Sequence, residues 1–455
     1  MTVEEYLTLD HFCNKKAMQT KSDTPNKTML LMFITGLEAS LIIMLLFFPK
    51  SLEGYTSAFI VCSAIYLLMC IVVFKNSLKE RDIILLIGFW FLLKILFLTY
   101  QPIGSDDYYR YLWDGKVQLN GINPFLYAPN DQRLNSLHSE LLPAKVSYPN
   151  IKTIYFPVSQ VLFVVSFAIG SSSVWGLKLF LLLCDILILV SLYFLFRKLD
   201  LPIKYILLYA ALPLIHFQFF IDAHIDIAGA ALMMAAITLY LYQKKYFGYV
   251  LLGLSLSIKP PAILLLPFFF QKENTIKGKT ASIVLPVSIL ILSFLPYVFT
   301  ASPIETLINY SSHWTFNGMI YNFVQILISD NYTIRIICGA LYIAVYAVLF
   351  FSKLDFFKKI YLSIFLLMIF SPIVHPWYLI WFAVLLPITR SFSGLYFVSA
   401  VSLTFFTVMN FQTTNNWMEY PVVLLAEYLP IVILFFYEMI KLKFDWNIFE
   451  RSIPE

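Results

Sequence analysis

Charged residues are scarce in this chain. Asp, Glu, Lys and Arg make up 13% of its 455 residues, whereas soluble globular proteins carry about 25%. Hydrophobic residues account for 60% of the sequence, and the mean hydropathy is +0.77. A soluble fold cannot hide this much apolar surface in its core. The composition therefore excludes an ordinary soluble enzyme and predicts an integral membrane protein.

Cysteine is also rare, and clusters of basic residues are missing. Four of the five cysteines lie in apolar runs, and Cys13 lies in the polar N-terminal segment. None falls between residues 101 and 174, so we expect no disulfide framework. The net charge of +5 comes from scattered lysines and arginines, a distribution that does not indicate binding to nucleic acid.

What the chain has in abundance is apolar runs that can form membrane helices. Twelve of them occupy residues 29–48, 55–74, 83–100, 175–196, 204–222, 225–242, 281–300, 331–351, 359–372, 376–389, 393–411 and 421–440. A further run, 246–271, is interrupted by Pro260 and Pro261 and predicts a hairpin of two short helices. We therefore expect an all-α, polytopic bundle of about 12–14 crossings. It would span residues 29–440, with short tails at 1–28 and 441–455.

The basic residues predict how this bundle is oriented. Loops on one side carry 22 of the 32 lysines and arginines, and the positive-inside rule places that side in the cytoplasm. We therefore expect a multi-pass protein of the plasma membrane with both tails in the cytoplasm. The long segment 101–174 then lies outside the cell.

This outer segment is the longest stretch without a predicted crossing. It is rich in Tyr, Trp, Phe and Ile, so we expect it to be ordered. Its last part, TIYFPVSQVLFVVSFAIG, is apolar, but counting it as a crossing would place Arg197 and Lys198 outside. We predict a half-buried or re-entrant helix there instead.

Carboxylates gather near the start of the outer segment, in GSDDYYRYLWDG at residues 104–115. A helix over 105–119 puts four polar side chains of this stretch on one face. They are Asp107, Arg110, Tyr111 and Asp114. Asp106 projects about 100° away from Asp107, so only one of the two adjacent aspartates lies on the polar face.

Two interpretations of this helix are possible. An Asp107–Arg110 salt bridge on a helix at the membrane interface is the simpler one. In the other, a carboxylate acts as a base that faces a substrate at the membrane surface. The second interpretation also allows a divalent cation, Mg²⁺ or Mn²⁺, with Asp106 as its candidate ligand.

Other ionisable residues within the apolar part of the chain fall on the predicted outer side. They are Asp222, His224 and Asp226 in DAHID, Lys259 in SIKPPA and His375 in SPIVHPWY. A solvated turn, or a lysine that reaches the headgroups, would explain each of them separately. All of these residues fall on the same predicted side of the membrane. This distribution favours chemistry at the outer surface over a pump, because a pump also needs ionisable groups through the membrane midplane. Lys94 is the clear exception to this distribution.

The same residues carry a family resemblance. The runs SDDYYRYLWDGKVQLNGINPFLYAP and TIYFPVSQ, with AHID, KPP and HPWY further along, resemble bacterial polytopic glycosyltransferases of the GT-C fold. More narrowly, they resemble polyprenyl-phosphate-mannose-dependent mannosyltransferases, over roughly residues 104–390. The chain departs from this pattern at Phe156, where relatives usually have Pro, and at Ile225, where they usually have Asn.

The resemblance implies a GT-C-like membrane bundle and an inverting transfer of a hexose. The donor would be a polyprenyl-phosphate sugar, with mannose suggested by the family name, and the acceptor a glycan or lipid on the outer face. Asp107 matches the aspartate of the family motif and is the expected general base, with Asp106 orienting it or binding a cation. The residues expected to bind the substrates are Arg110, Tyr111, Asp114, Tyr155, His224, Asp226, Lys259 and His375. Lys259 would hold the donor phosphate, and membrane lipids would surround the bundle.

Three other functions compete with this one. A lipid-linked sugar flippase predicts paired half-helices at the midplane and polar residues towards both sides, whereas this chain has one broken hairpin. A metal-dependent hydrolase needs a cluster of His and Asp ligands that the chain supplies only thinly. A transferase that uses a nucleotide sugar needs a phosphate site on the inner side. The inner loops, such as RKLDLPIK and QKENTIKGKT, contain no glycine-rich phosphate cradle.

Overall fold

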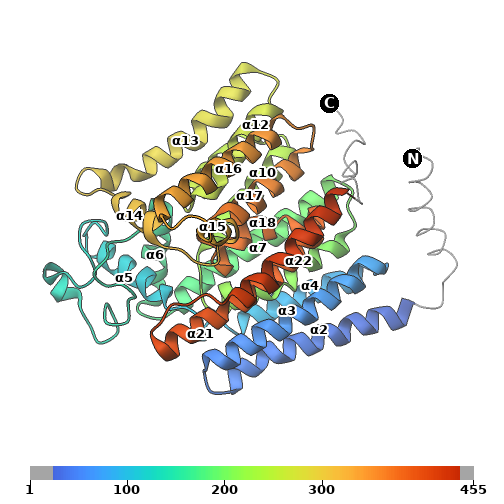
Figure 1. Ribbon diagram of the computed structural model, residues 1–455, viewed down its shortest axis with the longest axis horizontal. Coiled ribbons are helices and arrows are strands. Elements are labelled where there is room, and N and C mark those ends of the chain that lie inside the picture. Colours follow the sequence, from blue (N-terminus) through green and yellow to red (C-terminus); the bar gives the residue numbers. More distant parts are fainter. Residues whose placement is uncertain (1–23, 441–455) are drawn as a thin grey trace.

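The computed structural model describes residues 24–440, and within them it consists of helices, most of which are joined by short connections (Figure 1). No strand is present in this range, which holds only two isolated bridges. The predicted all-α class is therefore confirmed. Most of both predicted tails, together with Cys13, lies outside the described residues.

Within residues 24–440, seven helical segments are long and apolar enough to cross a membrane. They are α2 (Thr24–Phe47), α3 (Leu52–Lys75), α7 (Trp175–Lys198), α13 (Ile276–Val298), α16 (Asn331–Phe351), the segment Phe392–Thr414 and α22 (Pro421–Ile440). An eighth crossing results if the bent pair Ile203–Ala210 and Pro213–Ile221 is counted as one span. The chain is a polytopic membrane protein, as its composition predicts.

The expected 12–14 crossings exceed the number of helices that can cross by themselves. Three of the predicted runs form helices of only 15 or 16 residues: α4 (Glu80–Ile95), α10 (Asp226–Leu241) and α17 (Phe356–Phe370). At 1.5 Å per residue they reach about 24 Å, less than the roughly 30 Å of a hydrocarbon core. Residues 376–389 divide into η5 (Pro376–Leu379), α18 (Ile380–Ala383) and α19 (Leu386–Thr389). Apolarity alone therefore overestimates the number of full-length helices.

Side chains that accept a hydrogen bond from the first turn mark the starts of several long helices, as is typical of N-caps. These caps are Ser51, Thr275, Asp330, Asp355 and Ser391. The predicted break at the proline pair is also present. It separates α11 (Lys245–Leu256) from η4 (Pro260–Leu265) and α12 (Leu266–Lys272). Lys259 precedes the break in an extended conformation, because a residue before proline disfavours the helical region.

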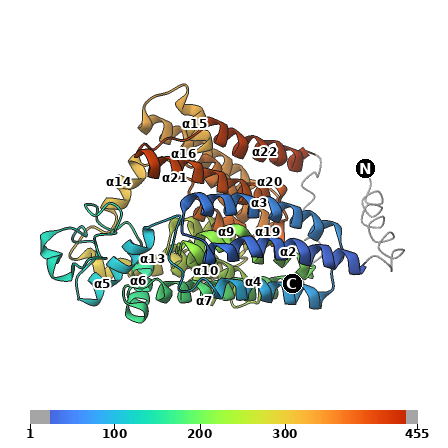
Figure 2. The same ribbon diagram turned by 90° about the horizontal axis from the view of Figure 1, so that it is seen from below.

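Segment 101–174 lies at one end of the bundle. It contains α5 (Asp107–Leu119), η1 (Gln132–Leu137) and α6 (Pro157–Gly170). The start of α2 and the end of α22 lie at the opposite end in both views (Figures 1 and 2). Helix α14 (Glu305–His313) lies at the same end of the molecule as α5 and α6 (Figure 1).

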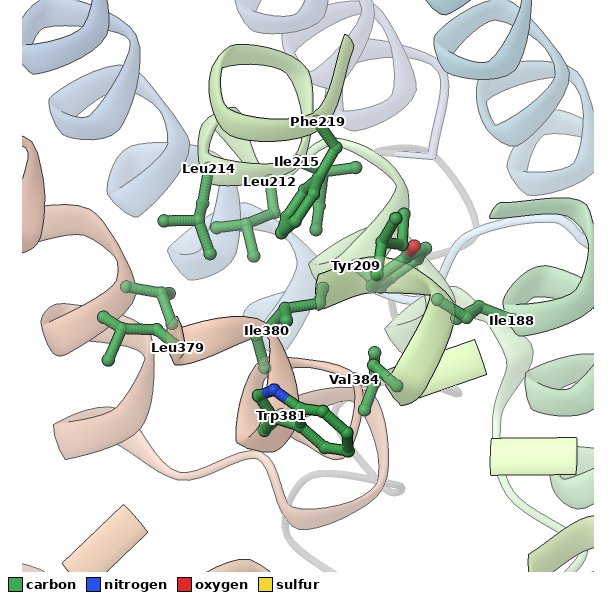
Figure 3. Packing of buried hydrophobic residues seen from close by; sticks show 14 of the residues in the cluster. Ile188, Tyr209, Leu212, Leu214, Ile215, Phe219, Leu379, Ile380, Trp381 and Val384 are labelled. Carbon is green, nitrogen blue, oxygen red and sulfur yellow. The ribbon is translucent and has the colours of Figure 1, made fainter. Parts of the chain in front are cut away.

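The centre of the bundle is built from short, interrupted helices that are buried on every side. Here α8 (Leu207–Ala210), α9 (Pro213–Ile215) and η3 (His216–Ile221) meet η5 and α18. Figure 3 shows the apolar side chains that fill this contact, among them Tyr209, Leu212, Ile215, Phe219, Leu379, Ile380 and Trp381. Irregular backbone is tolerated at membrane depth only where protein covers it. This core fixes the turn after η3 and the segment before η5, which both carry polar side chains.

Candidate active site

Helix α5 is held tightly against α6. A Cβ at Gly115 would collide with the carbonyl oxygen of Phe163, so the close approach of the two helices needs a glycine here. The ring of Tyr111 stacks on that of Phe163 with 4.7 Å between centroids. Gly121, with φ of +74°, follows the end of the helix, as the sequence predicts. These contacts make α5 a rigid support for its polar face.

Arg110 and Asp114 face the neighbouring backbone and α6. Arg110 donates to the carbonyl oxygen of Ile151 at 2.6 Å and lies 4.0 Å from Asp114. Asp114 is buried and accepts a 3.0 Å hydrogen bond from Gln160. Within residues 24–440 the ion pair of Arg110 is with Asp114, so the Asp107–Arg110 salt bridge of the simpler interpretation is not formed. Both residues link α5 to the segments around it.

A cavity of about 530 Å³ opens beside the N-terminal end of α5. Most of the residues predicted to form the site line it: Asp107, Arg110, Tyr111, Tyr155, Asp226, Lys259 and His375. Asp106, Asp114 and His224 are not among its lining residues. The structure therefore brings together residues from α5, the loop before α6, the start of α10, the proline break and η5.

Asp107 presents a half-buried carboxyl group to this cavity. Burial raises its pKa to about 7, the nearby charge of Asp106 adds to that rise, and Lys259 opposes it. At neutral pH the carboxyl group is therefore divided between its protonated and ionised forms. A group with this pKa is well suited to accept a proton from a substrate.

Lys259 and Asp226 form an ion pair on the cavity wall. The Lys259 Nζ lies 2.6 Å from the Asp226 Oδ1 and 4.3 Å from the centre of the Tyr378 ring. Trp381 Nε1 donates to the same carboxylate oxygen at 3.4 Å. The Asp226 Oδ2 is buried and has no hydrogen-bond partner among the described residues. The pair thus places one cation and one free carboxylate oxygen beside Asp107.

Stacked rings connect the two histidines of the predicted site. Trp377 stacks on His224 with 3.6 Å between centroids and on His375 with 4.4 Å. His224 is fully buried behind the cavity, with its Nδ1 3.6 Å from Asp107 Oδ2. Burial and the neighbouring Lys259 lower the pKa of His375 to about 3, so its imidazole is neutral at physiological pH.

Aromatic residues that were not among the predicted site residues contribute much of the cavity wall. They are Tyr148, Phe156, Tyr310, Trp314, Trp377, Tyr378 and Trp381. Trp377 and Tyr378 belong to the HPWY run, and Trp314 follows His313, so adjacency to a histidine is a signal in the sequence. Aromatic faces suit both sugar rings and apolar chains. His313 itself is exposed and contacts Ser312 and Asn309.

Asp222, the remaining ionisable residue of DAHID, lies away from the cavity wall. Asp222 accepts hydrogen bonds from the backbone N–H groups of Ile103 and Gly104 and from the hydroxyl of Tyr55. It therefore fastens the beginning of segment 101–174 to η3 and α3. Asp222 and Asp226 are four residues apart in sequence but have different surroundings.

The residues do not form a metal site. Between residues 24 and 440, no group of three or more His, Cys, Asp or Glu side chains is placed to hold a metal ion. Asp106, the candidate ligand, is exposed and is not part of the cavity wall. We therefore assign no chemical step to a bound cation.

Comparison with known proteins gives one family. The family described as alpha-(1→6)-mannopyranosyltransferase, N-terminal domain, matches residues 34–271, which is about half of the chain. No curated protein matches the chain. The matched range includes α5, α6, the DAHID turn and Lys259, whereas α14 and His375 lie beyond it.

Proposed function

The chain belongs to the alpha-(1→6)-mannopyranosyltransferase family, and we propose that it transfers mannose. The donor is a polyprenyl-phosphate mannose, and the acceptor is a hydroxyl group of a glycan or lipid. The reaction takes place at the outer face of the plasma membrane. One observation carries this proposal: Asp107 and the Lys259–Asp226 pair line the same aromatic cavity at one end of the bundle.

In this mechanism Asp107 acts as the general base. Its carboxylate accepts the proton of the acceptor hydroxyl while that oxygen forms a bond to the anomeric carbon of mannose. The bond between the anomeric carbon and the phosphate oxygen breaks, and polyprenyl phosphate leaves with the electron pair. Attack from the opposite side inverts the anomeric centre. An α-linked product, as in the family name, then requires a β-linked donor.

The charges around the cavity support this assignment. The leaving phosphate gains negative charge in the transition state, and a fixed cation stabilises that charge. Three cations of the described residues line the cavity: Lys259, Arg110 and Lys152. Lys259 lies beside Asp226 and acts on Asp107, whereas the guanidinium group of Arg110 is engaged by the backbone of residues 148–151. Lys152 is not among the charges that shift the pKa of Asp107. We therefore propose that Lys259 contacts the donor phosphate.

The apolar part of the cavity wall supports a lipid-linked donor. Ile258, Ile263, Leu264, Leu367 and Met368 line it together with the aromatic residues. A prenyl chain gains free energy when such side chains remove it from water. A nucleotide would instead need several polar contacts for its phosphates and base, whereas most of the surface of this wall is apolar.

The test uses purified protein in nanodiscs with two mannose donors, one linked to polyprenyl phosphate and one to a nucleotide. Mass spectrometry would detect transfer to a panel of glycan and glycolipid acceptors. We expect transfer from the lipid-linked donor alone. Transfer from the nucleotide donor in membranes free of lipid-linked sugar would contradict the proposal.

Asp107→Asn tests the base in the same assay. We expect turnover to fall by about 10²–10⁴-fold, the usual contribution of a positioned base. Asp131→Asn is the matched control, because Asp131 belongs to the same outer segment but pairs with Arg133 outside the cavity. If Asp107→Asn keeps more than about a tenth of wild-type turnover, another group is the base.

A further inference from the structure

We propose that His224 is a positioning residue for Asp107, with its neutral imidazole donating a hydrogen bond from Nδ1–H to the Asp107 carboxylate when that carboxylate is ionised. The inference rests on the proposed function and changes the role of His224. The sequence predicts contact with the substrate, whereas the structure places His224 behind the cavity wall.

The first observation is an unsatisfied buried ring. His224 has no exposed surface, and neither of its ring nitrogens has a hydrogen-bond partner among the described residues. Buried polar groups normally have partners, and an exception calls for a functional or structural reason. The Nδ1 lies 3.6 Å from Asp107 Oδ2, which is longer than a hydrogen bond. An ionised carboxylate attracts an N–H donor more strongly than a protonated one, so the contact can close to a hydrogen bond when Asp107 ionises.

The second observation is that the ring cannot turn freely. His224 stacks on Trp377 with an angle of 14° between their planes. Trp377 in turn stacks on His375, and Tyr310 lies 3.5 Å from the Nε2 of His375. This stack restrains the plane of the His224 imidazole, and within that plane Nδ1 is the ring nitrogen that lies 3.6 Å from Asp107 Oδ2.

Burial is the main reason that His224 stays neutral. The acidic and basic groups around the two side chains are Asp106 and Arg110 of α5, Asp226 of α10, Lys259 before η4, and His375 before η5. Five tyrosines of the described chain also face Asp107: Tyr111, Tyr148, Tyr155, Tyr310 and Tyr378. Burial, and then the neighbouring Lys259 and His375, hold the pKa of His224 well below its usual value. A neutral imidazole can orient the carboxylate without cancelling its charge. A charged imidazolium would instead lower the pKa of the carboxyl group and so make it a weaker base. A donor that binds the ionised carboxylate also favours ionisation of Asp107.

Three substitutions separate this role from simple packing. His224→Phe keeps a ring on Trp377 but removes the donor. His224→Asn places an amide near the position of Nδ1, and His224→Gln places it near that of Nε2, farther from Asp107. His216→Phe is the matched control, because His216 is a buried histidine that packs on Trp90 and bonds to the Leu212 carbonyl, away from the cavity.

The first readout needs no sugar donor. A hydrophobic carbodiimide modifies protonated carboxyl groups, and mass spectrometry of the Asp107 peptide follows its labelling against pH in nanodiscs. We expect the labelling midpoint to move to higher pH by about half a unit or more in His224→Phe and His224→Gln, because the ionised form loses its donor. His224→Asn should restore part of the shift, and His216→Phe should match the wild type. An unchanged midpoint in both His224→Phe and His224→Gln would overturn the proposal.

The second readout is the kinetics of mannose transfer. In His224→Phe we expect kcat to fall about tenfold or more, with donor KM within about twofold, because positioning acts on the chemical step. A rise in donor KM at unchanged kcat would instead show direct substrate contact and overturn the proposal. If the wild type transfers mannose from no donor, the proposed function fails, and the labelling experiment still decides the role of His224.

Discussion

The ammonium group of Lys259 lies 2.6 Å from the Asp226 carboxylate, and the two form the ion pair of the cavity wall. The lysine side chain is 21% exposed and the aspartate side chain 1%. A donor phosphate would therefore approach Lys259 from its open side while Asp226 remains behind it. Removal of the lysine alone leaves the buried Asp226 carboxylate without its partner. This lowers the stability of the fold in addition to weakening donor binding.

Lys259→Ala should weaken binding of the lipid-linked donor by about tenfold or more, because a charge-assisted contact to phosphate contributes roughly 1.5–3 kcal/mol. Lys259→Arg should keep most of the binding. The double variant Lys259→Ala/Asp226→Asn should recover thermal stability without recovering donor binding. Lys245→Ala is the control, since Lys245 forms a 2.7 Å ion pair with Glu273 at the other end of α11. Equal donor affinity in Lys259→Ala and Lys245→Ala would remove Lys259 from the site.

The pH dependence of transfer should report the ionisation of Asp107. A base must be ionised, so kcat/KM should fall as the pH drops below about 7, the pKa of its carboxyl group. After burial, the charge of Asp106 is the largest cause that raises this pKa. Asp106→Asn should therefore move the acidic limb of the profile to lower pH and leave the plateau unchanged. Loss of the plateau would show that Asp106 takes part in the reaction itself.

Gly115→Ala should destabilise the protein, because the added methyl group collides with the Phe163 carbonyl oxygen and forces α5 away from α6. Overpacking of this kind costs about 1–3 kcal/mol. Gly339→Ala is the comparison: Gly339 lies in α16 and a Cβ there meets nothing within 4 Å. Thermal unfolding in detergent should show a lower Tm for Gly115→Ala alone. Equal Tm values would mean that the two helices can separate without cost.

The orientation predicted from the basic residues can be tested by labelling in whole cells. A cysteine at the exposed position Ser136 of η1 should react with an impermeant maleimide from outside. A cysteine at Lys198, at the end of α7, should react only after the membrane is opened. Cys13→Ser removes the tail thiol, and the four cysteines of the described residues are buried. The reverse pattern would invert the topology and place the cavity on the cytoplasmic side.

Local sequence was enough to locate most of the helices. Helical hydrogen bonds join residues four apart, and membrane insertion depends on runs of apolar side chains. For this reason α16 and α22 begin and end where the apolar runs do, and Pro260 and Pro261 break the hairpin. The helical repeat also placed Asp107, Arg110 and Tyr111 together on one face of α5.

The same repeat could not determine which of those side chains face a cavity. Asp114 shares the face of Asp107, yet it packs against Gln160 of α6. Asp107 lies about two turns nearer the N-terminal end of the helix, where α10, the proline break and η5 converge. The different surroundings of the two aspartates arise from the segments that pack against α5, and the sequence of α5 does not encode which segments these are.

The contacts between distant segments were decided by tertiary structure alone. Trp377 holds His224 and His375 in one stack, and Lys259 pairs with Asp226, because the interrupted helices of the buried core bring these segments together. Hydrophobic patterning shows only that those helices are buried. Their bends and packing set the distances between polar groups, since close-packed side chains from many segments must fit at once.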